Sequence, residues 1–342
     1  CTVDSPDNRC GIFLVEKIQK GYGLMTEKKQ IGILAILIVF TGLLCVFFGI
    51  RSGKSTPERM TSAILNNKYK DAVTKVEVSQ HGEVLTLYKD ASLQSNWVGY
   101  SDSDPELVFP VDSVSMEEFL QNSTDIRDFV LISKNPDPQK LESFNLLDSS
   151  EITVNYYADE SSVSSVTFGS NNYSGQKIYV TTPDSPIYEI HDDFFPWLTT
   201  AGKSWANMNF VPKNIMGITD ASDIQRIIVS SKATGKGKNL TNATATAAAT
   251  EGELFKEIAD KVLSLRGGAL INPTVAEGVS EIFELRLETG NTNSVTLKVY
   301  PYKDSFVVIP TVFLNTVAEG YRLNYGFEIS TWTYNTMAQW VE

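Results

Sequence analysis

Residues 76–87 read Val-Glu-Val-Ser-Gln-His-Gly-Glu-Val-Leu-Thr-Leu. Apolar and polar side chains alternate at 76–78 and again at 83–87, which is typical of strands with one buried face. His81-Gly82 lies between these two segments and is a turn signal. We therefore predict a β-hairpin here, with His81 as a turn residue.

A helix is predicted to follow this hairpin. Ser115 and Glu118 have the spacing of a capping box, and Val114 could pack onto Phe119 as a hydrophobic staple. Apolar residues then recur at helical spacing as far as Val130, so the expected helix spans residues 111–130.

The same pattern recurs later in the chain. Thr250 and Glu253 form a second capping box, and an apolar stripe follows it as far as Gly267-Gly268. A run of strand-like segments follows each helix: 151–157, 165–168, 177–180 and 188–190 in the first run, and 281–287, 294–297, 305–309 and 327–329 in the second. The cap, a Ser-Val-Thr triplet and an aromatic-Glu-Ile triplet occur in the same order both times, so we predict an internally duplicated unit.

The predicted fold class is α+β, with each unit packing one helix on a mostly antiparallel sheet. Short connections at 158–162 and 289–293 favour hairpins over parallel crossovers. We expect the first unit over residues 73–210 and the second over 211–342. The first carries extra strand-like residues around Trp97 and 107–109, and the second carries a polar stretch, 234–250, predicted as a mobile loop.

One segment predicts a membrane anchor. Residues 31–50 read Ile-Gly-Ile-Leu-Ala-Ile-Leu-Ile-Val-Phe-Thr-Gly-Leu-Leu-Cys-Val-Phe-Phe-Gly-Ile and contain no charged side chain. At about 1.5 Å per residue a helix of this length spans about 30 Å, the thickness of the hydrocarbon core of a bilayer. We expect a transmembrane helix from Ile31 to Ile50, in contact with the lipid bilayer.

The flanks of this segment are a short tail over residues 1–30 and a tether over 51–72. A natural start at Met25 would leave residues 1–24 outside the native protein. A short N-terminal side followed by a long polar domain is the usual layout of a signal anchor, so we expect the N-terminus inside and the large domain outside a bacterial inner membrane.

Three other interpretations of the apolar segment were weighed. A buried core helix would not need twenty uncharged residues. A cleaved signal peptide normally has a shorter apolar core and small residues at the cut, where this chain has Phe47 and Phe48. A lipoprotein signal ending at Cys45 would need small residues in place of Leu43 and Leu44.

Charge and cysteine content restrict the function. The net charge is −12, and residues 1–55 hold seven Lys/Arg and four Asp/Glu, so the remainder carries −15. An acidic surface repels phosphate backbones, which makes nucleic acid an unsuitable partner. No cysteine follows Cys45, so the large domain has no internal disulfide.

Few residues suggest catalysis. Gly53-Lys54-Ser55 and Gly202-Lys203-Ser204 resemble the end of a phosphate-binding loop, but neither has the required upstream glycine. The only histidines are His81 and His191, and no zinc-ligand pattern or nucleophile elbow is present. We predict no catalytic, cofactor-binding or metal-binding residues and no cofactor.

Three groups have both a functional and a structural interpretation. Asp192 and Asp193 beside His191 could bind a cation or act as acid and base, but such a pair more often caps a helix. Glu189 and Glu328 occupy equivalent places in the two runs and are expected to be paired or solvated. Four tryptophans could line a groove for glycan or peptide, or simply pack at the ends of the units: Trp97, Trp197, Trp332 and Trp340.

The first unit resembles a bacterial family. The resemblance covers about residues 70–210 and rests on short motifs: Tyr88-Lys89 leading to Trp97, Leu141 to Leu146, Phe168-Gly169, Ile178 to Val180 and Ile187 to Ile190. These are similar to domain-of-unknown-function family 4340. The usual Tyr-Gly-Leu of that family is here Phe144-Asn145-Leu146, which is a departure from its pattern.

The resemblance implies a single-anchor envelope protein associated with gliding-motility-type ABC transporter components. It carries over no catalytic residue. The expected function is therefore a non-enzymatic, membrane-anchored accessory or scaffold protein that contacts a membrane or periplasmic protein. A periplasmic module for cell-wall glycan or peptide is the first alternative, and a hydrolase using His191 with a nearby carboxylate is the second.

Overall fold

The structure is a computed structural model of the whole chain, and it divides into two compact units, residues 1–57 and 58–342. The residues that it describes are 36–43, 63–125, 129–147, 151–182, 186–191, 195, 198–242, 249–315 and 323–342.

The first unit contributes one described segment, a helix over residues 36–43. Its large apolar side chains are exposed, with Ile36 70% and Phe40 60% accessible. Among the described residues, none of the helices has the length and apolar character needed to cross a membrane. The predicted span of Ile31 to Ile50 extends beyond this helix at both ends and lies mostly outside the described residues, as do the tail and most of the tether.

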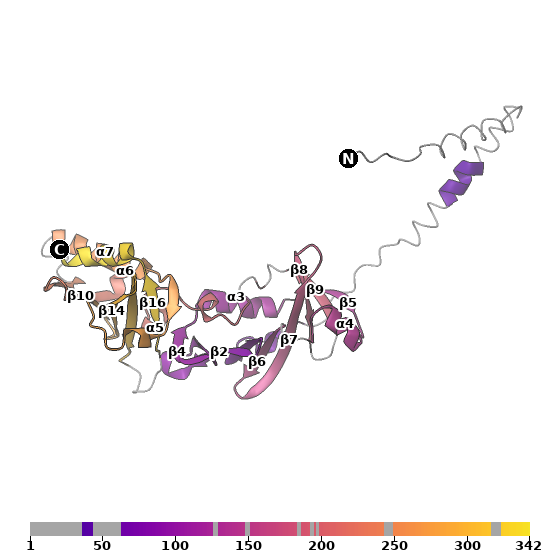
Figure 1. Ribbon diagram of the computed structural model, residues 1–342, viewed down its shortest axis with the longest axis horizontal. Helices are drawn as coiled ribbons and strands as arrows, with labels where there is room; N and C mark the ends of the chain where they lie inside the picture. The colour runs from indigo at the N-terminus through magenta and orange to yellow at the C-terminus, as the bar shows by residue number, and fades with distance from the viewer. Residues whose placement is uncertain are drawn as a thin grey trace, which may run out of the picture. The chain divides into compact units, whose positions relative to one another are not determined.

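The second unit is an α+β structure with two antiparallel sheets and few helices (Figure 1). The first sheet has the order β4-β3-β2-β1-β6-β7-β8-β9-β5. Its strands are β1 (Lys75–Gln80), β2 (Glu83–Asp90), β3 (Asn96–Ser101), β4 (Asp104–Pro110), β5 (Val130–Ser133), β6 (Ile152–Ala158), β7 (Ser161–Asn171), β8 (Lys177–Thr181) and β9 (Ile187–His191). The helices within this part of the chain are α3 (Ser113–Ser123) and α4 (Pro138–Ser143).

The second sheet has the order β11-β10-β13-β14-β15-β16-β12. Its strands are β10 (Ile224–Ser231), β11 (Lys236–Thr241), β12 (Ala269–Ile271), β13 (Phe283–Thr289), β14 (Ser294–Tyr302), β15 (Ser305–Phe313) and β16 (Gly326–Ile329). The helices here are α5 (Lys213–Met216), α6 (Ala249–Ser264) and α7 (Thr331–Ala338).

The two sheets share one strand order. When β3 and β4 are set aside, the first sheet runs β2-β1-β6-β7-β8-β9-β5, and the second runs β11-β10-β13-β14-β15-β16-β12. The two orders correspond position by position: β10 and β11 stand where β1 and β2 do, β12 where β5 does, and β13 to β16 where β6 to β9 do. The main helix also holds the same place, since α3 precedes β5 and α6 precedes β12. The predicted boundary between residues 210 and 211 falls between the two sets of strands.

The hairpin at the start of the first sheet is confirmed. β1 and β2 pair antiparallel from Lys75 opposite Tyr88 to Gln80 opposite Glu83. His81 and Gly82 make the two-residue turn with φ of 53° and 82°, the left-handed values that this type of hairpin requires. The predicted hairpin connections at 158–162 and 289–293 also join antiparallel neighbours, β6 to β7 and β13 to β14.

Each sheet buries one face beneath helices (Figure 1). In the first core, Phe119 of α3 stacks on Tyr156 of β6 with 5.8 Å between ring centroids and meets Trp205 edge-on at 5.1 Å. In the second, one side of α6 is fully buried, at Phe255, Ile258, Ala259 and Val262. Burying a side chain of this size stabilises the fold by about 1.5–3 kcal/mol each.

The hairpin β3–β4 joins the first sheet to the second part of the chain. The backbones of Val108 and Asn324 exchange two hydrogen bonds, of 3.1 and 2.9 Å. The Asn272 side chain donates to Asp104 at 2.8 Å. Phe109 packs against Gly202 so closely that a β-carbon there would touch its ring. These contacts are made by the β3–β4 hairpin, which has no counterpart among the described strands of the second sheet.

Two details of the first predicted helix are wrong. α3 begins at Ser113, and its cap is Asp112, whose carboxylate accepts hydrogen bonds from the Ser115 backbone N–H (3.0 Å) and hydroxyl (2.7 Å). Ser115 is therefore a donor inside the helix and not the cap. Val114 is 72% exposed, so it makes no hydrophobic staple.

The helix is also shorter than predicted. It ends at Ser123. Val130 is instead the first residue of β5 and pairs with Glu189 of β9. The apolar residues near 130 fit the edge of a sheet as well as a helical stripe, and pairing with a distant strand decides between the two. Ile126 lies outside the described residues.

The second helix and the predicted loop need similar corrections. α6 is already helical at Ala249, so Thr250 lies within it and not at its cap. Within the predicted loop 234–250, Lys236–Thr241 form β11, paired with β10 from Arg226 to Ser231. Backbone pairing to β10 holds this polar segment, which buries only Leu240. Residues 243–248 lie outside the described part of the chain.

Candidate functional site

The structure does not bring the two histidines together. His81 lies in the β1–β2 turn and His191 ends β9, and β6, β7 and β8 separate these strands in the sheet. Both side chains are exposed. Asp192 and Asp193 lie outside the described residues, as does Trp197, so the proposed helix cap there is untested.

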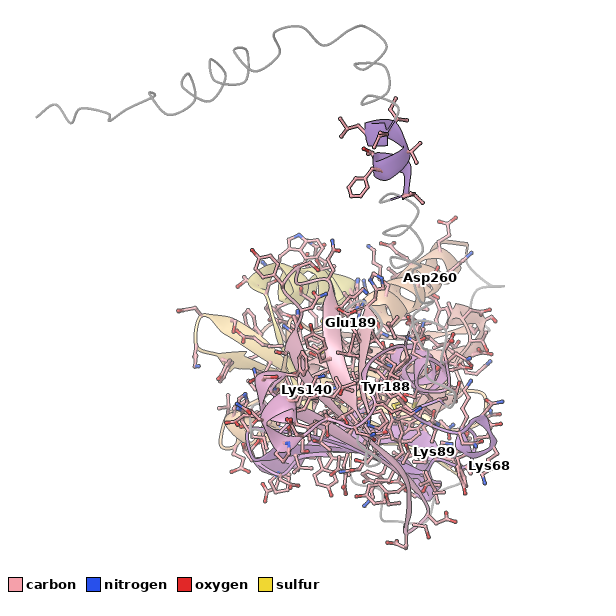
Figure 2. All side chains as sticks on the ribbon, turned by 90° about the vertical axis from the view of Figure 1, so that its right-hand side faces the viewer. Lys68, Lys89, Lys140, Tyr188, Glu189 and Asp260 are labelled. Carbon is pink, nitrogen blue, oxygen red and sulfur yellow. The ribbon has the colours of Figure 1, made fainter. Side chains whose placement is uncertain are left out.

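The two equivalent glutamates are both hydrogen-bonded, in different ways. Glu189 on β9, labelled in Figure 2, accepts from Lys177 Nζ at 3.0 Å and from Asn172 Nδ2 at 2.9 Å. Glu328 on β16 accepts from the Ser305 hydroxyl at 2.8 Å. This agrees with the expectation that these residues are paired.

The Gly202-Lys203-Ser204 segment has a structural role. It forms a single 3-10 turn against Phe109, and the Trp205 indole that follows is fully buried and donates to the Thr199 carbonyl at 2.8 Å.

The described tryptophans do not line one groove. Trp340 is buried, and Trp332 on α7 is 74% exposed. Trp97 is half-buried beside a cavity of only 70 Å³, near Pro110 and Asn207. A cavity of that size holds about two water molecules, which is too small for a sugar ring or a peptide.

A hollow of 820 Å³ lies in the first sheet and is lined by residues of β1 to β4 with the β6–β7 turn. Tyr88 and Tyr100 meet edge-on in it with centroids 6.1 Å apart. Lys89, labelled in Figure 2, and Lys75 supply positive charge, and Glu160 supplies negative charge. The hollow depends on β3 and β4, which have no counterpart in the described part of the second sheet.

A polar network adjoins this hollow on β1 and β6. Lys75 Nζ lies 2.9 Å from Glu77 and 4.0 Å from the centroid of the Tyr157 ring, and the Tyr157 hydroxyl donates to Glu77 at 2.6 Å. The sequence carries a signal for part of this network, because Lys75 and Glu77 are two residues apart and share a face in a strand. Tyr157 could not be added without the β1–β6 register, which sets it opposite Lys75.

This network changes the pKa values of Glu77 and Tyr157. Partial burial raises the pKa of Glu77, but the hydrogen bonds from Tyr157 and Lys75 and the charge of Lys75 outweigh burial, so the pKa of Glu77 is lowered. The hydrogen bond to Glu77, then burial, then the charge of Glu77 raise the pKa of Tyr157 to about 12. Glu77 is therefore a fixed anion held by its neighbours, which makes it poorly suited to accept a proton from a substrate.

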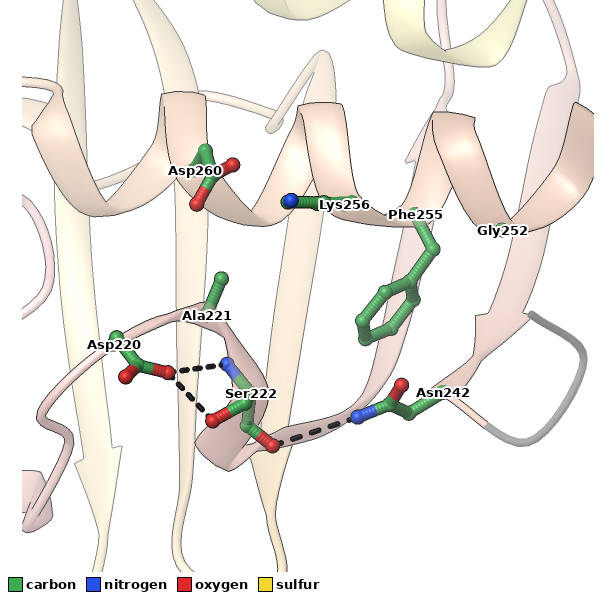
Figure 3. A pocket seen from close by; sticks show the side chains of 8 residues that line it. All are labelled: Asp220, Ala221, Ser222, Asn242, Gly252, Phe255, Lys256 and Asp260. Atoms are coloured by element: carbon green, nitrogen blue, oxygen red, sulfur yellow. Dashed lines mark hydrogen bonds between the residues drawn. The ribbon is translucent and has the colours of Figure 1, made fainter.

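A second cavity, of 470 Å³, lies between α6 and the turn before β10 (Figure 3). Phe255 points from α6 toward Asn242, and Lys256 and Asp260 lie on the same helix. The Asp220 carboxylate accepts from the Ser222 hydroxyl (2.6 Å) and backbone N–H (2.7 Å), which together lower the pKa of Asp220. These bonds hold the turn, so Asp220 is engaged in structure.

The chemistry available in these sites is recognition by charge and aromatic contact. Over the described ranges, no group of three His, Cys, Asp or Glu side chains is placed to hold a metal ion. The hollow of the first sheet combines charges of both signs with an aromatic pair, the side-chain type that is enriched at protein interfaces.

Comparison with known proteins gives no relative: no protein-family model matches the chain, and no curated protein or solved structure resembles it significantly.

Proposed function

We propose that this chain is a membrane-anchored, extracytoplasmic accessory or scaffold protein of an envelope complex of the ABC transporter type, without enzymatic activity of its own. The anchor is Ile31 to Ile50 in the inner membrane of a bacterium, with the N-terminus inside. The observation that carries the proposal is the uncharged run itself, where Ile36 and Phe40 expose most of their apolar surface. Apolar side chains exposed in a row need a non-aqueous partner.

The shared strand order supports internal duplication. Seven strands and one helix recur in the same roles, and among the described residues β3 and β4 have no counterpart in the second sheet. Convergence on one seven-strand order within one chain is a less economical explanation than copying and divergence. The scaffold would thus present two related sheets, one of them elaborated.

The geometry of one motif supports the family resemblance. Asn145 has φ of 53°, a left-handed conformation that glycine adopts most readily and asparagine next. The departure from Tyr-Gly-Leu to Phe144-Asn145-Leu146 therefore keeps the backbone that the motif needs. Gly169 of the Phe168-Gly169 pair packs directly on this same turn.

The partner surface would be the 820 Å³ hollow of the first sheet. It is lined in part by the additional strands β3 and β4, it contains Tyr88 and Tyr100, and it carries charges of both signs. The hydrogen bonds that hold its acidic neighbour Glu77 are in keeping with a binding role for this hollow.

Fractionation tests the anchor. The variant carrying Phe40→Arg and Leu43→Arg should leave the membrane pellet for the soluble fraction, because a charge at the bilayer centre costs about 2.5–3.5 kcal/mol. Val114→Arg alters an exposed apolar residue of the folded unit and should stay in the pellet. A wild-type chain found in the soluble fraction, or a C-terminal reporter active only in the cytosol, would contradict the anchor.

Crosslinking tests the partner. A photoreactive amino acid at Lys89, in the hollow, should capture an envelope protein in gently solubilised membranes. The same probe at Tyr173, which is fully exposed in the β7–β8 turn, is the matched control and should capture far less. Purification of the chain alone, with no adduct from position 89, would count against the accessory role.

A further inference from the structure

The equivalent glutamates of the two sheets differ in their partners. Glu189 lies opposite Tyr179 in the β8–β9 pair, and Glu328 lies opposite Val307 in the β15–β16 pair. Lys177 begins β8, two residues before Tyr179, and Ser305 begins β15, two residues before Val307. These two side chains therefore occupy the same place relative to their glutamate.

The first glutamate has an internal cation. Lys177 Nζ lies 3.0 Å from Glu189, whose side chain is only 14% exposed. The second has a neutral donor, since the Ser305 hydroxyl satisfies Oε1 of Glu328 and brings no positive charge. A half-buried carboxylate without a compensating charge is less well stabilised than one with an ammonium partner.

The second sheet has a hollow beside Glu328, on the side where the first sheet has Lys177. A hollow of 580 Å³ lies beside Glu328 and Ser305, a volume within the usual range of small-molecule sites. Asp304 adds a second carboxylate, and Trp332 lines the same hollow with 74% of its surface exposed. An exposed indole face attracts cations as well as apolar groups.

The hydrogen bond and charge of Tyr302, and then the charge of Glu328, raise the pKa of Lys303, so Lys303 acts on Glu328 without contacting it. Lys303 lies over the ring of its neighbour Tyr302, 4.8 Å from the centroid. Among the described residues no ion pair within 4.0 Å joins it to Glu328.

We propose that the hollow at Glu328, Asp304 and Trp332 binds an alkylammonium group, which takes the place that the Lys177 ammonium holds in the first sheet. The group comes either from a lysine side chain of a partner protein or from a free polyamine. This site is separate from the hollow of the first sheet and does not depend on the membrane anchor.

Titration of the full chain tests the site. The probes are Nα-acetyl-lysine N-methylamide, its Nε-acetylated neutral form, and putrescine, each followed by the NMR shift of the Trp332 indole N–H, assigned with Trp332→Phe. We expect an affinity on the order of tens of millimolar for the charged lysine probe, because an exposed ion pair and one cation–π contact are both weak. Tighter binding of the lysine probe identifies a protein side chain as the source, and tighter binding of putrescine identifies a free polyamine.

Three variants sharpen the test. Glu328→Gln should weaken binding at least about fivefold, and Asp260→Asn, which removes one negative charge in the separate cavity of α6, should leave it unchanged. Ser305→Lys should supply the internal ammonium, as in the first sheet, and abolish binding while the fold and its unfolding midpoint are retained. Equal binding of the neutral lysine probe, or full binding by Glu328→Gln or by folded Ser305→Lys, would overturn the proposal.

Discussion

The backbone carbonyl of Phe144 lies against Gly169 so closely that no β-carbon fits between them. The Ser170 N–H donates to the same carbonyl at 2.9 Å, and the Phe144 ring lies 4.2 Å from the ring of Tyr179. The turn after α4 is thus fixed onto the β7 and β8 strands by one close approach, one hydrogen bond and one aromatic contact.

Gly169→Ala should therefore destabilise the fold. The added methyl group would force the turn away from β7, and overpacking of this kind costs about 1–3 kcal/mol. Urea unfolding of the full chain, followed by tryptophan fluorescence, measures the change. Gly290→Ala is the matched control, because a β-carbon there meets only Gln225 at an ordinary 3.7 Å. Equal midpoints for the two variants would contradict the close packing of this turn.

Asn145 offers a second test of the same turn. Its φ of 53° costs a β-branched residue about 1–2 kcal/mol, whereas glycine accepts it without strain. Asn145→Val should lower the free energy of unfolding by about this amount, and Asn145→Gly should leave it nearly unchanged. If valine were tolerated as well as glycine, the left-handed assignment would be wrong.

Two variants of helix α3 can distinguish its observed cap, Asp112, from the predicted capping box of Ser115 and Glu118. Asp112→Ala removes the acceptor for Ser115 and should cost about 1 kcal/mol. Glu118→Ala, at the predicted capping-box partner, should change stability by less than about 0.5 kcal/mol. Thermal unfolding by circular dichroism compares the two, and the reverse ranking would restore the original assignment.

Tyr157 gives a pH-dependent prediction. Its pKa in the folded chain, about 12, lies above the ordinary value of 10.0, so its contribution to stability is complete below pH 10 and is lost as the pH rises through 12. For Glu77 the folded pKa is lowered, so its contribution is present above the ordinary 4.5 and is lost as the pH falls through the folded value.

Glu77→Gln should consequently lower the pKa of Tyr157 toward 10. NMR titration of ring-labelled tyrosine measures it, and Tyr157→Phe identifies the resonance. A pKa of Tyr157 that stays near 12 in Glu77→Gln would show that burial and not the glutamate causes the shift.

Much of the sheet structure could be predicted from local patterns. Alternation identified both strands of the first hairpin, and β6 to β9 and β13 to β16 each overlap a predicted segment. These strands have apolar residues at every second position on a face that the helices cover, so the pattern and the burial have one cause.

The misassigned elements depend on distant pairing. Among the described residues β5 pairs with β9 alone and β12 with β16 alone, and each strand has only 4 or 3 residues, so its sequence carries little signal of its own. β11 is polar and is held through its backbone by β10, which composition does not reveal. The candidate sites were missed for the same reason: Glu328 and Ser305 come from different strands, and only the register sets them side by side.

The order of the strands has a consequence for biosynthesis. β5 must wait for β9, about fifty residues further along, before its backbone can pair, and β12 must wait likewise for β16. Such long sequence separations slow the search for the native state. While the polypeptide is being made, each emerging edge stays open to wrong neighbours until its closing strand arrives, so a chaperone that shields nascent β segments would raise the yield of this protein more than one that acts on finished chains.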